Sequence, residues 1–525
     1  MREAVAAWEA ALGSRHVILD ESERRAAESA TYPTRQSIPV ILRPGNRAEI
    51  QEILRIANRF QVPLYAVSTG KNWGYGSRVP SAGGCALVEL HRLNRIVAFD
   101  ERLAYVTVEP GVTQRQLFTF LKENGSKLWM DATGASPDCS LIGNTVERGF
   151  GHTPYGDHFA NCCGLEVVLP DGEVARTGFA GWKGAHAAAV YRWGVGPSLD
   201  GLFTQSNLGI VTRMTVWLMP APEYFQAFFF RCEERHGLGP LVDALRPLRL
   251  NGTLRSTVHI GNDYKVLSGI RQYPWEEAGG RTPLPENVMS RFRRQLQFGH
   301  WNGSGALYGT KAQVAEARRL VRGALRGNVG RLQFLDENTL RLAERFAKPY
   351  RWLTGWDLSR TLELARPVLG LMKGIPAEQT LGSVYWRKRG PIPAQPDPDR
   401  DGCGLLWYSP VAPLEGSHVE RASGIATEVL TRHGFEPMIS LSLVTDRAVA
   451  CVVSISYDRA QAGEDGRAMA CYEELGRSLT EAGYPPYRLG NMPVKGAGSD
   501  AIGEKLKRAF DPAGVLSPGR YARVD

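Results

Sequence analysis

The sequence lacks the long apolar runs and the clustered cysteines that define several classes of protein. No stretch approaches the roughly 18 unbroken apolar residues of a membrane-spanning helix. Eight cysteines are scattered over 525 residues without a CxxC pair, so neither a disulfide scaffold nor a zinc finger is indicated. The segment from Met1 to Leu19 places Glu3, Trp8 and Glu9 where a secretory signal would be basic and then apolar. We therefore expect a soluble, reduced, cytoplasmic protein.

Charge of one sign is not concentrated anywhere in the chain. Lys and Arg number 63 against 54 Asp and Glu, and the basic residues often lie beside acids, as in 21–25 and 344–345. Nucleic-acid-binding proteins usually gather basic residues in one stripe with aromatic residues between them. The distribution favours an anionic small molecule as partner and disfavours nucleic acid.

The first part of the chain has the pattern of an α/β domain. A length of 525 residues allows two or three compact units. Apolar periodicity and proline positions predict a helix over 1–35, strands at 38–44, 62–67, 86–90 and 104–109, and helices at 47–60 and 114–123. The run 165–173, with Asp171-Gly172 at its turn, predicts a hairpin, and 209–218 a further strand.

The pattern changes near residue 225. Strands such as 225–231 and 448–456 alternate there with long helices at 310–326, 336–347 and 416–433. A proline-rich loop, 389–400, crosses this part. We therefore expect a second domain over 225–484.

Two glycine-rich segments are the richest candidates for a binding site. Ser68 to Gly76 follows a predicted strand and holds three glycines, which let backbone N–H groups approach an oxyanion closely. Such a turn is also common in ordinary loops. The second segment, 140–157, combines glycines with aromatic and apolar residues. Within and after it, His152 and His158 could ligate a metal with Asp157, but structural hydrogen bonding is the favoured reading and we expect no metal.

Several common sequence motifs for nucleotide binding and hydrolysis are absent or incomplete. Gly496 to Ala501 matches GxGxxA, but no strand leads into it and the chain ends before a ribose-binding acid could follow. The sequence contains neither GxxxxGK[ST] nor GxSxG, which excludes P-loop chemistry and the α/β-hydrolase mechanism. Cys162 and Cys163 are read as small buried residues.

Taken in order, these segments resemble the flavoprotein family of vanillyl-alcohol oxidase and p-cresol methylhydroxylase, which includes eugenol and 4-ethylphenol oxidases. The resemblance covers nearly the whole chain. It rests on residues 68–76, 142–149, 155–158, 194–212 and 511–520.

The resemblance implies an α+β fold. A two-part α/β FAD-binding domain of the p-cresol methylhydroxylase type would be interrupted by a cap domain built on an antiparallel sheet, with the substrate between them. We accordingly expect the FAD-binding domain over 1–224 and 485–525, and the cap over 225–484.

By the same resemblance, the two glycine-rich segments and the strand after residue 208 hold FAD. The residues expected to contact FAD are Ser68, Thr69, Gly70, Lys71, Asn72, Gly74, Ser140, Leu141, Ile142, Gly143, Asn144, Arg148, Gly149, Tyr155, Gly156, Gly209, Ile210 and Val211. Arg520 should lie near the pyrimidine ring of the flavin, where a positive charge favours the anionic reduced form.

The phenol pocket of the family uses two tyrosines and an arginine, which match Tyr75, Tyr487 and Arg488. A guanidinium and two hydroxyl donors stabilise a phenolate, because they bind the charged form preferentially. The resemblance therefore implies hydride loss from the para-benzylic carbon of a 4-substituted phenol, through a quinone methide. Oxygen or a cytochrome would then reoxidise the flavin. Relatives are often dimers, which implies a homodimer.

Two departures from the family pattern matter. Trp129 to Asp138 places its Pro-Asp pair differently, so Asp138 is either a base beside the flavin, with a pKa raised by burial, or a turn-capping residue. Leu405 stands where vanillyl-alcohol oxidase carries its flavin-linking histidine. Tyr408 and Cys403 are read as strand residues, so we expect FAD to be held without a covalent bond.

Two alternatives remain open. A member of the same family could oxidise a non-phenolic alcohol or a biosynthetic intermediate, as the changed aspartate segment allows. A flavin-binding protein without turnover is the other, because a fold alone does not establish chemistry.

Overall fold

The computed structural model describes residues 1–341, 366–492 and 501–521. Residues 496–500 of the GxGxxA run and residues 342–347 of the helix expected over 336–347 lie outside these ranges. No helix in the described ranges combines the length and apolar character that crossing a bilayer requires.

The prediction of one helix over residues 1–35 is wrong. Helix α1 (Arg2–Leu12) ends because Gly13 adopts a φ of 82°, which a glycine reaches without strain. A short strand β1 (Val17–Ile18) and helix α2 (Glu21–Ala27) follow. Asp20 caps α2 by accepting a hydrogen bond from the Glu23 amide. The alanine-rich residues 1–35 therefore contain two short helices in place of one long helix.

The first sheet has the order β1-β2-β4-β3. Its strands β2 (Ile41–Leu42), β3 (Leu64–Val67) and β4 (Ala86–Glu89) are parallel to one another. Helix α3 (Arg47–Phe60), with the predicted bounds, buries Ile50, Ile53, Leu54 and Ala57. The predicted strand, helix, strand unit is therefore confirmed, although its strands are shorter than expected.

The second sheet is antiparallel and five-stranded, with the order β5-β6-β10-β8-β9. Its strands are β5 (Ile96–Asp100), β6 (Tyr105–Val108), β8 (Cys162–Val168), β9 (Val174–Arg176) and β10 (Ile210–Trp217). The predicted β8–β9 hairpin is confirmed, and at its turn the Asp171 carboxylate accepts from the Glu173 amide. Helices α4 (Gln114–Glu123) and α5 (Leu141–Val146) lie in the connections, and β7 (Leu128–Trp129) pairs with β11 (Met219–Pro220).

The third sheet has eight strands, and all its pairs are antiparallel. The order is β15-β12-β14-β13-β18-β19-β16, and β17 pairs with β19. The strands are β12 (Tyr224–Cys232), β13 (Val258–Asn262), β14 (Trp301–Gly309), β15 (Arg331–Leu335), β16 (Cys403–Tyr408), β17 (Val411–Pro413), β18 (Met438–Leu443) and β19 (Ala448–Asp458).

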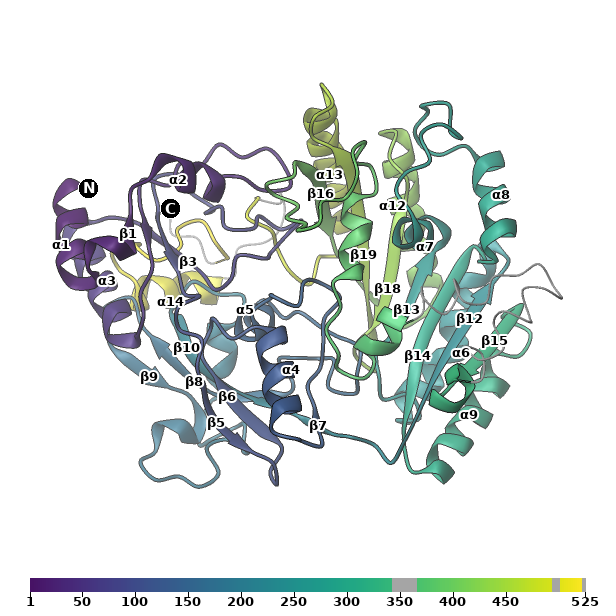
Figure 1. Cartoon of the computed structure of the whole chain (residues 1–525), viewed down its shortest axis with the longest axis horizontal. Coiled ribbons are helices and arrows are strands. Elements are labelled where there is room, and N and C mark those ends of the chain that lie inside the picture. Colours follow the sequence, from purple (N-terminus) through teal and green to yellow (C-terminus); the bar gives the residue numbers. More distant parts are fainter. Residues whose placement is uncertain (342–365, 493–500, 522–525) are drawn as a thin grey trace.

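Helices cover one face of this sheet. They are α6 (Leu238–Leu250), α9 (Lys311–Leu325), α12 (Gly416–Arg432) and α13 (Glu464–Glu481), and their apolar sides form the largest core with the sheet. Helices α7 (Asp263–Ile270), α8 (Glu286–Leu296) and the 3-10 helix η5 (Gln379–Tyr385) lie elsewhere in the connections. Figure 1 shows the eight-stranded sheet on one side of the molecule and the two smaller sheets on the other.

The C-terminal residues return to the first sheet. After α14 (Ala501–Phe510), the amide of Leu64 in β3 donates to the Val515 carbonyl, and the Ser517 amide donates to the Leu64 carbonyl. In Figure 1, helix α14 accordingly lies beside the N-terminal elements. The α+β class predicted from the sequence is confirmed. We propose the same division near residues 225 and 485 as the boundaries of the domains.

Candidate active site

The two glycine-rich segments lie against each other. The Ser140 amide donates to Thr69 Oγ1 at 3.2 Å. A Cβ built on Gly143 would lie 3.1 Å from Ser68 Oγ. Ser140 also caps α5, because its Oγ accepts from the Gly143 amide at 2.9 Å. Segments 70 residues apart in the sequence thus form one binding surface.

Unused backbone donors line the first segment. In the described part of the chain, the amides of Gly70, Lys71, Asn72 and Trp73 donate no hydrogen bond, whereas the Gly74 amide donates to Thr31 Oγ1. Gly70 and Gly74 have φ values of 71° and 75°, which turn the backbone where other residues would be strained. A run of free amides fits the oxyanions of a pyrophosphate.

Other predicted FAD contacts lie in the second glycine-rich segment and in β10. Gly149 and Gly156 permit close packing, since a Cβ on Gly149 would lie 2.2 Å from Asn144 Oδ1 in the same segment, and one on Gly156 would lie 2.6 Å from Thr257 Oγ1, just before β13. Gly209 leads into β10, and Ile210 and Val211 there pair with β8. Arg148 has a φ of 52° and stacks its guanidinium over Phe159.

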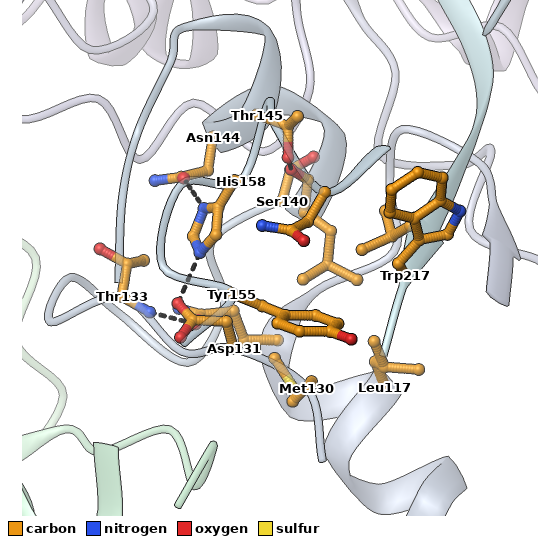
Figure 2. Close-up of a pocket in the computed structure, with 14 residues that line it drawn as sticks. Leu117, Met130, Asp131, Thr133, Ser140, Asn144, Thr145, Tyr155, His158 and Trp217 are labelled. Carbon is orange, nitrogen blue, oxygen red and sulfur yellow. Dashed lines mark hydrogen bonds and ion pairs between the residues drawn. The ribbon is translucent and has the colours of Figure 1, made fainter. Parts of the chain in front are cut away.

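A small cavity beside α5 holds a fixed imidazole (Figure 2). His158 contacts Asn144 Oδ1 through Nδ1 at 2.6 Å and Asp131 Oδ2 through Nε2 at 2.7 Å. Asp131 also accepts from the Thr153 amide at 2.6 Å. The favoured reading of His158 as a hydrogen-bonding residue is therefore confirmed. Within the described ranges no group of His, Cys, Asp and Glu is arranged to hold a metal ion.

A carboxylate that the sequence analysis missed organises the arginines. Glu147 contacts Arg520 Nη2 with both oxygens at 3.0 Å, Arg488 Nη2 at 3.2 Å and the Tyr521 hydroxyl at 2.5 Å. Burial would raise the pKa of Glu147, but Arg520 and Arg488 outweigh it and hold the pKa below its usual value. The only sequence signal for Glu147 was its place within the second glycine-rich segment, between Val146 and Arg148.

Tyr75, Tyr487 and Arg488 come together as predicted, although their roles remain proposals. The Arg488 guanidinium lies 4.1 Å from the Tyr75 ring centroid and donates to Asn72 Oδ1 at 2.8 Å. The Tyr75 hydroxyl hydrogen-bonds Ser409 Oγ at 2.7 Å, and the Tyr487 amide donates to the Ser409 carbonyl at 3.0 Å. Burial raises the pKa of Tyr75 well above its ordinary value, so its hydroxyl stays protonated near neutral pH.

Two histidines extend this cluster, and the sequence analysis did not connect them. His259 in β13 packs against His152, with ring centroids 4.3 Å apart, and against Phe150 at 6.5 Å. Phe150 in turn lies 5.8 Å from the Tyr487 ring. Burial lowers the pKa of His152, and burial together with His152 holds the pKa of His259 well below its usual value. Both imidazoles are therefore neutral near pH 7.

Asp138 is not in this cluster. Its side chain is 51% exposed and forms an ion pair with Arg115 at 2.8 Å. Of the two alternatives for Asp138, this exposed ion pair does not fit a base in an apolar pocket beside the flavin. Asp131, with a side chain 5% exposed, is the buried carboxylate of this segment.

The residues expected at the flavin link and beside the flavin ring are both fixed by packing. Leu405 is buried, and a Cβ on Gly74 would lie 3.5 Å from its Cδ2, so it faces the first glycine-rich segment. Arg520 Nη1 donates to the Leu489 and Gly490 carbonyls at 2.8 and 2.6 Å.

Comparison with known proteins gives concordant results. Residues 38–178 match the model of the FAD binding domain family. The chain is 46% identical to 1'-carboxy-chondrochloren decarboxylase of Chondromyces crocatus, over 99% of this chain and 97% of that protein. It is 33% identical to the 4-cresol dehydrogenase [hydroxylating] flavoprotein subunit of Pseudomonas putida, over 90% and 85% of the two chains.

A solved structure shows the same overall fold. The structure of p-cresol methylhydroxylase with substrate bound superposes with a TM-score of 0.87 and 30% identity, over 99% of this chain and 96% of that one.

Proposed function

Because the chain belongs to the flavoprotein family of p-cresol methylhydroxylase and vanillyl-alcohol oxidase, whose cofactor is FAD, we propose that it removes hydride from the para-benzylic carbon of a 4-substituted phenol. The gathering of Tyr75, Tyr487 and Arg488 around Ser409 is the observation that carries this proposal. Tyr75 and Arg488 are buried there, and Tyr487 is partly covered beside them.

The charge balance of the cluster supports an anionic substrate. Arg488 and Arg520 share the single carboxylate of Glu147, which leaves one positive charge uncompensated within this group. A positive charge beside a phenol favours the phenolate and lowers the pKa of the substrate. The electron-rich phenolate then releases hydride more readily than the neutral phenol.

The FAD would be held by Ser68 to Gly74, Ser140 to Asn144 and Gly209 to Val211, whose free amides and close-packed glycines fit its pyrophosphate. When bound, FAD accepts the hydride. Oxygen or a cytochrome is the proposed final acceptor.

The histidine pair would accept the proton that is released when the quinone methide is converted to product. His152 Nδ1 contacts the Ala132 carbonyl at 3.1 Å, which assigns the proton to Nδ1 and leaves a lone pair on Nε2. A neutral imidazole can accept a proton from water adding to a quinone methide, or from the side chain when an alkene forms. We assign this task to His152 and His259 in place of Asp138.

A second candidate is oxidative decarboxylation. The 46% identity to a decarboxylase over nearly the whole chain favours it. The same hydride removal would begin the reaction, and a carboxylate on the side chain would leave as carbon dioxide.

The proposal is tested by mixing the protein anaerobically with 4-ethylphenol or with its O-methyl ether and following flavin absorbance. Bleaching by the free phenol alone is expected. Arg488→Ala should slow bleaching by about 100-fold or more, the scale of a lost electrostatic contact in an active site. Arg319→Ala, on exposed helix α9, is the matched control.

Equal bleaching by the phenol and its ether would contradict the phenolate mechanism and favour oxidation of a non-phenolic alcohol. Flavin that stays oxidised with every donor would favour binding without turnover. An Arg488→Ala protein that reacts at the original rate would remove Arg488 from the site.

A further inference from the structure

One face of the eight-stranded sheet carries small polar residues next to the proposed site. Val258, Ile260, Leu441 and Leu443 point into the helix-covered core. The alternating residues therefore face the other way. Across this second face His259 lies opposite Ser442, and Gly261 lies opposite Ser440. His259 contacts Phe150 and His152, so this face looks toward the proposed substrate.

A lysine lies over this face. Lys265 is in the first turn of α7, where its amide donates to Asn262 Oδ1 at 3.0 Å. A Cβ built on Gly261 would lie 3.5 Å from Lys265 Cγ, so the lysine stem covers the strand where a side chain is missing. Gly261 is two residues from His259, about 7 Å along the strand at roughly 3.4 Å per residue.

The ammonium of Lys265 has almost no partner. Its one hydrogen bond within the described residues reaches Ser383 Oγ at 3.5 Å, the outer limit of such a bond, and no carboxylate there pairs with it. Lys507 shows the usual arrangement of a buried lysine, with Asp511 Oδ2 at 2.6 Å and two carbonyl oxygens within 2.8 Å. A partly covered cation that no carboxylate neutralises is unfavourable, which suggests that its partner is a ligand.

Lys265 has no carboxylate partner among the described residues, so its positive charge is uncompensated there. Its side chain is only partly covered, yet burial lowers its pKa to about 8, so most molecules carry the proton at pH 7. His152 and His259 are neutral there. Ser440 and Ser442 add hydroxyl donors on the same face.

We infer that Lys265, with Ser440, binds a carboxylate on the side chain of the substrate. The inference rests on the proposed function: the phenol end would lie at Tyr75, Tyr487 and Arg488, and the acidic end beneath the cap sheet. The substrate class is then a 4-hydroxyphenyl compound whose side chain ends in a carboxylate.

The corresponding reaction balances. The phenolate of such a compound loses hydride from its benzylic carbon to the flavin and becomes a quinone methide. When the carboxylate is attached to the carbon next to the benzylic one, the bond between that carbon and the carboxylate then breaks, and its electron pair forms the alkene while the ring regains its phenolate. Carbon dioxide leaves without a proton transfer, and the flavin takes both electrons.

Binding without turnover isolates the carboxylate subsite. The probes are 4-hydroxycinnamate, 4-vinylphenol and cinnamate, which carry both groups, the hydroxyl alone and the carboxylate alone. None has a saturated benzylic carbon, so none can lose a benzylic hydride. Calorimetric titration of the FAD-loaded protein gives the three dissociation constants.

Lys265→Met should weaken 4-hydroxycinnamate and cinnamate about tenfold or more, the scale of a lost hydrogen bond to a charged group, and should leave 4-vinylphenol within about threefold. Lys265→Arg should restore part of the loss. Lys311→Met, at an exposed lysine of α9, should change none of the constants. Because Lys265 is unpaired, the methionine variant should fold at least as stably as the original protein.

The outcomes separate this inference from the proposed function. Equal weakening of all three probes, or no weakening, overturns the carboxylate subsite. If 4-hydroxycinnamate binds no better than cinnamate but cinnamate binding still depends on Lys265, the phenol proposal fails and the subsite stands.

Turnover gives a second readout from a matched pair. Both 3-(4-hydroxyphenyl)propionate, by loss of carbon dioxide, and 4-ethylphenol, by loss of a proton, can yield 4-vinylphenol. Lys265→Met should reduce kcat/KM for the acid at least tenfold relative to 4-ethylphenol. An unchanged ratio would contradict the subsite.

Discussion

At the scale of single residues, Glu147 is the carboxylate that joins Arg488 and Arg520 in the proposed site. It contacts Arg488, Arg520 and Tyr521 at once. Replacing it would leave two guanidinium groups sharing one region with no carboxylate between them, and their mutual repulsion would open the cluster.

Glu147→Gln should lower the free energy of unfolding by about 2 kcal/mol near pH 7. This is less than the roughly 3–5 kcal/mol typical of a broken buried pair, because the Glu147 side chain is 24% exposed. Its pKa is lower in the folded protein, so the carboxylate stabilises above the unfolded value of about 4.3 and loses that effect as the pH falls. Urea unfolding at pH 7 and pH 4 should show the difference shrinking at pH 4.

The control for this measurement is Glu316→Gln, an exposed residue of α9 paired with Arg319. It should leave the stability at pH 7 almost unchanged, because an exposed ion pair contributes little. A Glu147→Gln difference that persists at low pH would contradict the electrostatic origin.

Residue-scale prediction succeeded where the side chains follow an ordered motif. Tyr75, Tyr487 and Arg488 match short runs, and the structure gathers them. Asp138 was left with two alternatives because sequence spacing does not report burial, and its exposed ion pair with Arg115 argues against the buried base. His259 and Lys265 were missed because their significance arises only when a strand and a helix of the cap face the first half of the chain.

At the scale of elements, the proline-rich loop 389–400 packs against the first glycine-rich segment and the residue that follows it. Ser77 Oγ donates to Asp399 Oδ1 at 2.8 Å, and Lys71 Nζ contacts Asp397 Oδ2 at 3.4 Å. Burial raises the pKa of Asp399 to about 7. The loop therefore covers the segment whose free amides would hold FAD.

Asp399→Asn should stabilise the protein at pH 8 by on the order of 1–2 kcal/mol, because the amide still accepts from Ser77 and cannot ionise. The sign follows from the raised pKa: the folded state keeps its proton longer than the unfolded state, so ionisation above pH 4 costs stability. The gain should vanish near pH 4. Thermal unfolding across this range tests it.

Asp397→Asn serves as the companion variant. It removes the contact with Lys71 and should give no gain at pH 8. Equal stabilisation by both substitutions would attribute the effect to net charge and contradict the specific role of Asp399.

Elements with regular amphipathic patterns were predicted closely. Helices 47–60 and 114–123 have the observed bounds, because Asn46 and Thr113 cap them and their apolar residues repeat on one face. The expected helix over 1–35 failed at Gly13, where one left-handed residue outweighs favourable helix propensities on both sides.

At the scale of the whole molecule, the site is assembled from parts of the chain that are distant in sequence. Leu405 N donates to the Thr31 carbonyl, and Thr31 Oγ1 donates to the Leu405 carbonyl at 2.8 Å and accepts from the Gly74 amide at 3.1 Å. Thr31 therefore joins the cap sheet directly to the first glycine-rich segment. Composition and periodicity indicated two kinds of domain, but this joint depends on long-range packing that they do not encode.

The same joint bears on how FAD is held. Leu405, where a linking histidine was expected in the family, presents only methyl groups toward Gly74. Tyr408 is directed into the helix layer, where its hydroxyl contacts Thr480 at 3.0 Å. We therefore predict that FAD is bound without a covalent link.

Acid precipitation should leave the yellow flavin in the supernatant, and the thermal midpoint should rise with added FAD. A dissociable ligand that binds only the folded state stabilises by about 2.7 kcal/mol at 100 times its Kd, so the midpoint depends on concentration. Riboflavin, which has no pyrophosphate, is the control and should raise the midpoint less, because the free amides of Gly70 to Trp73 would then lack their partner. Flavin that stays with the precipitate, together with a midpoint insensitive to FAD, would establish a covalent link through another residue.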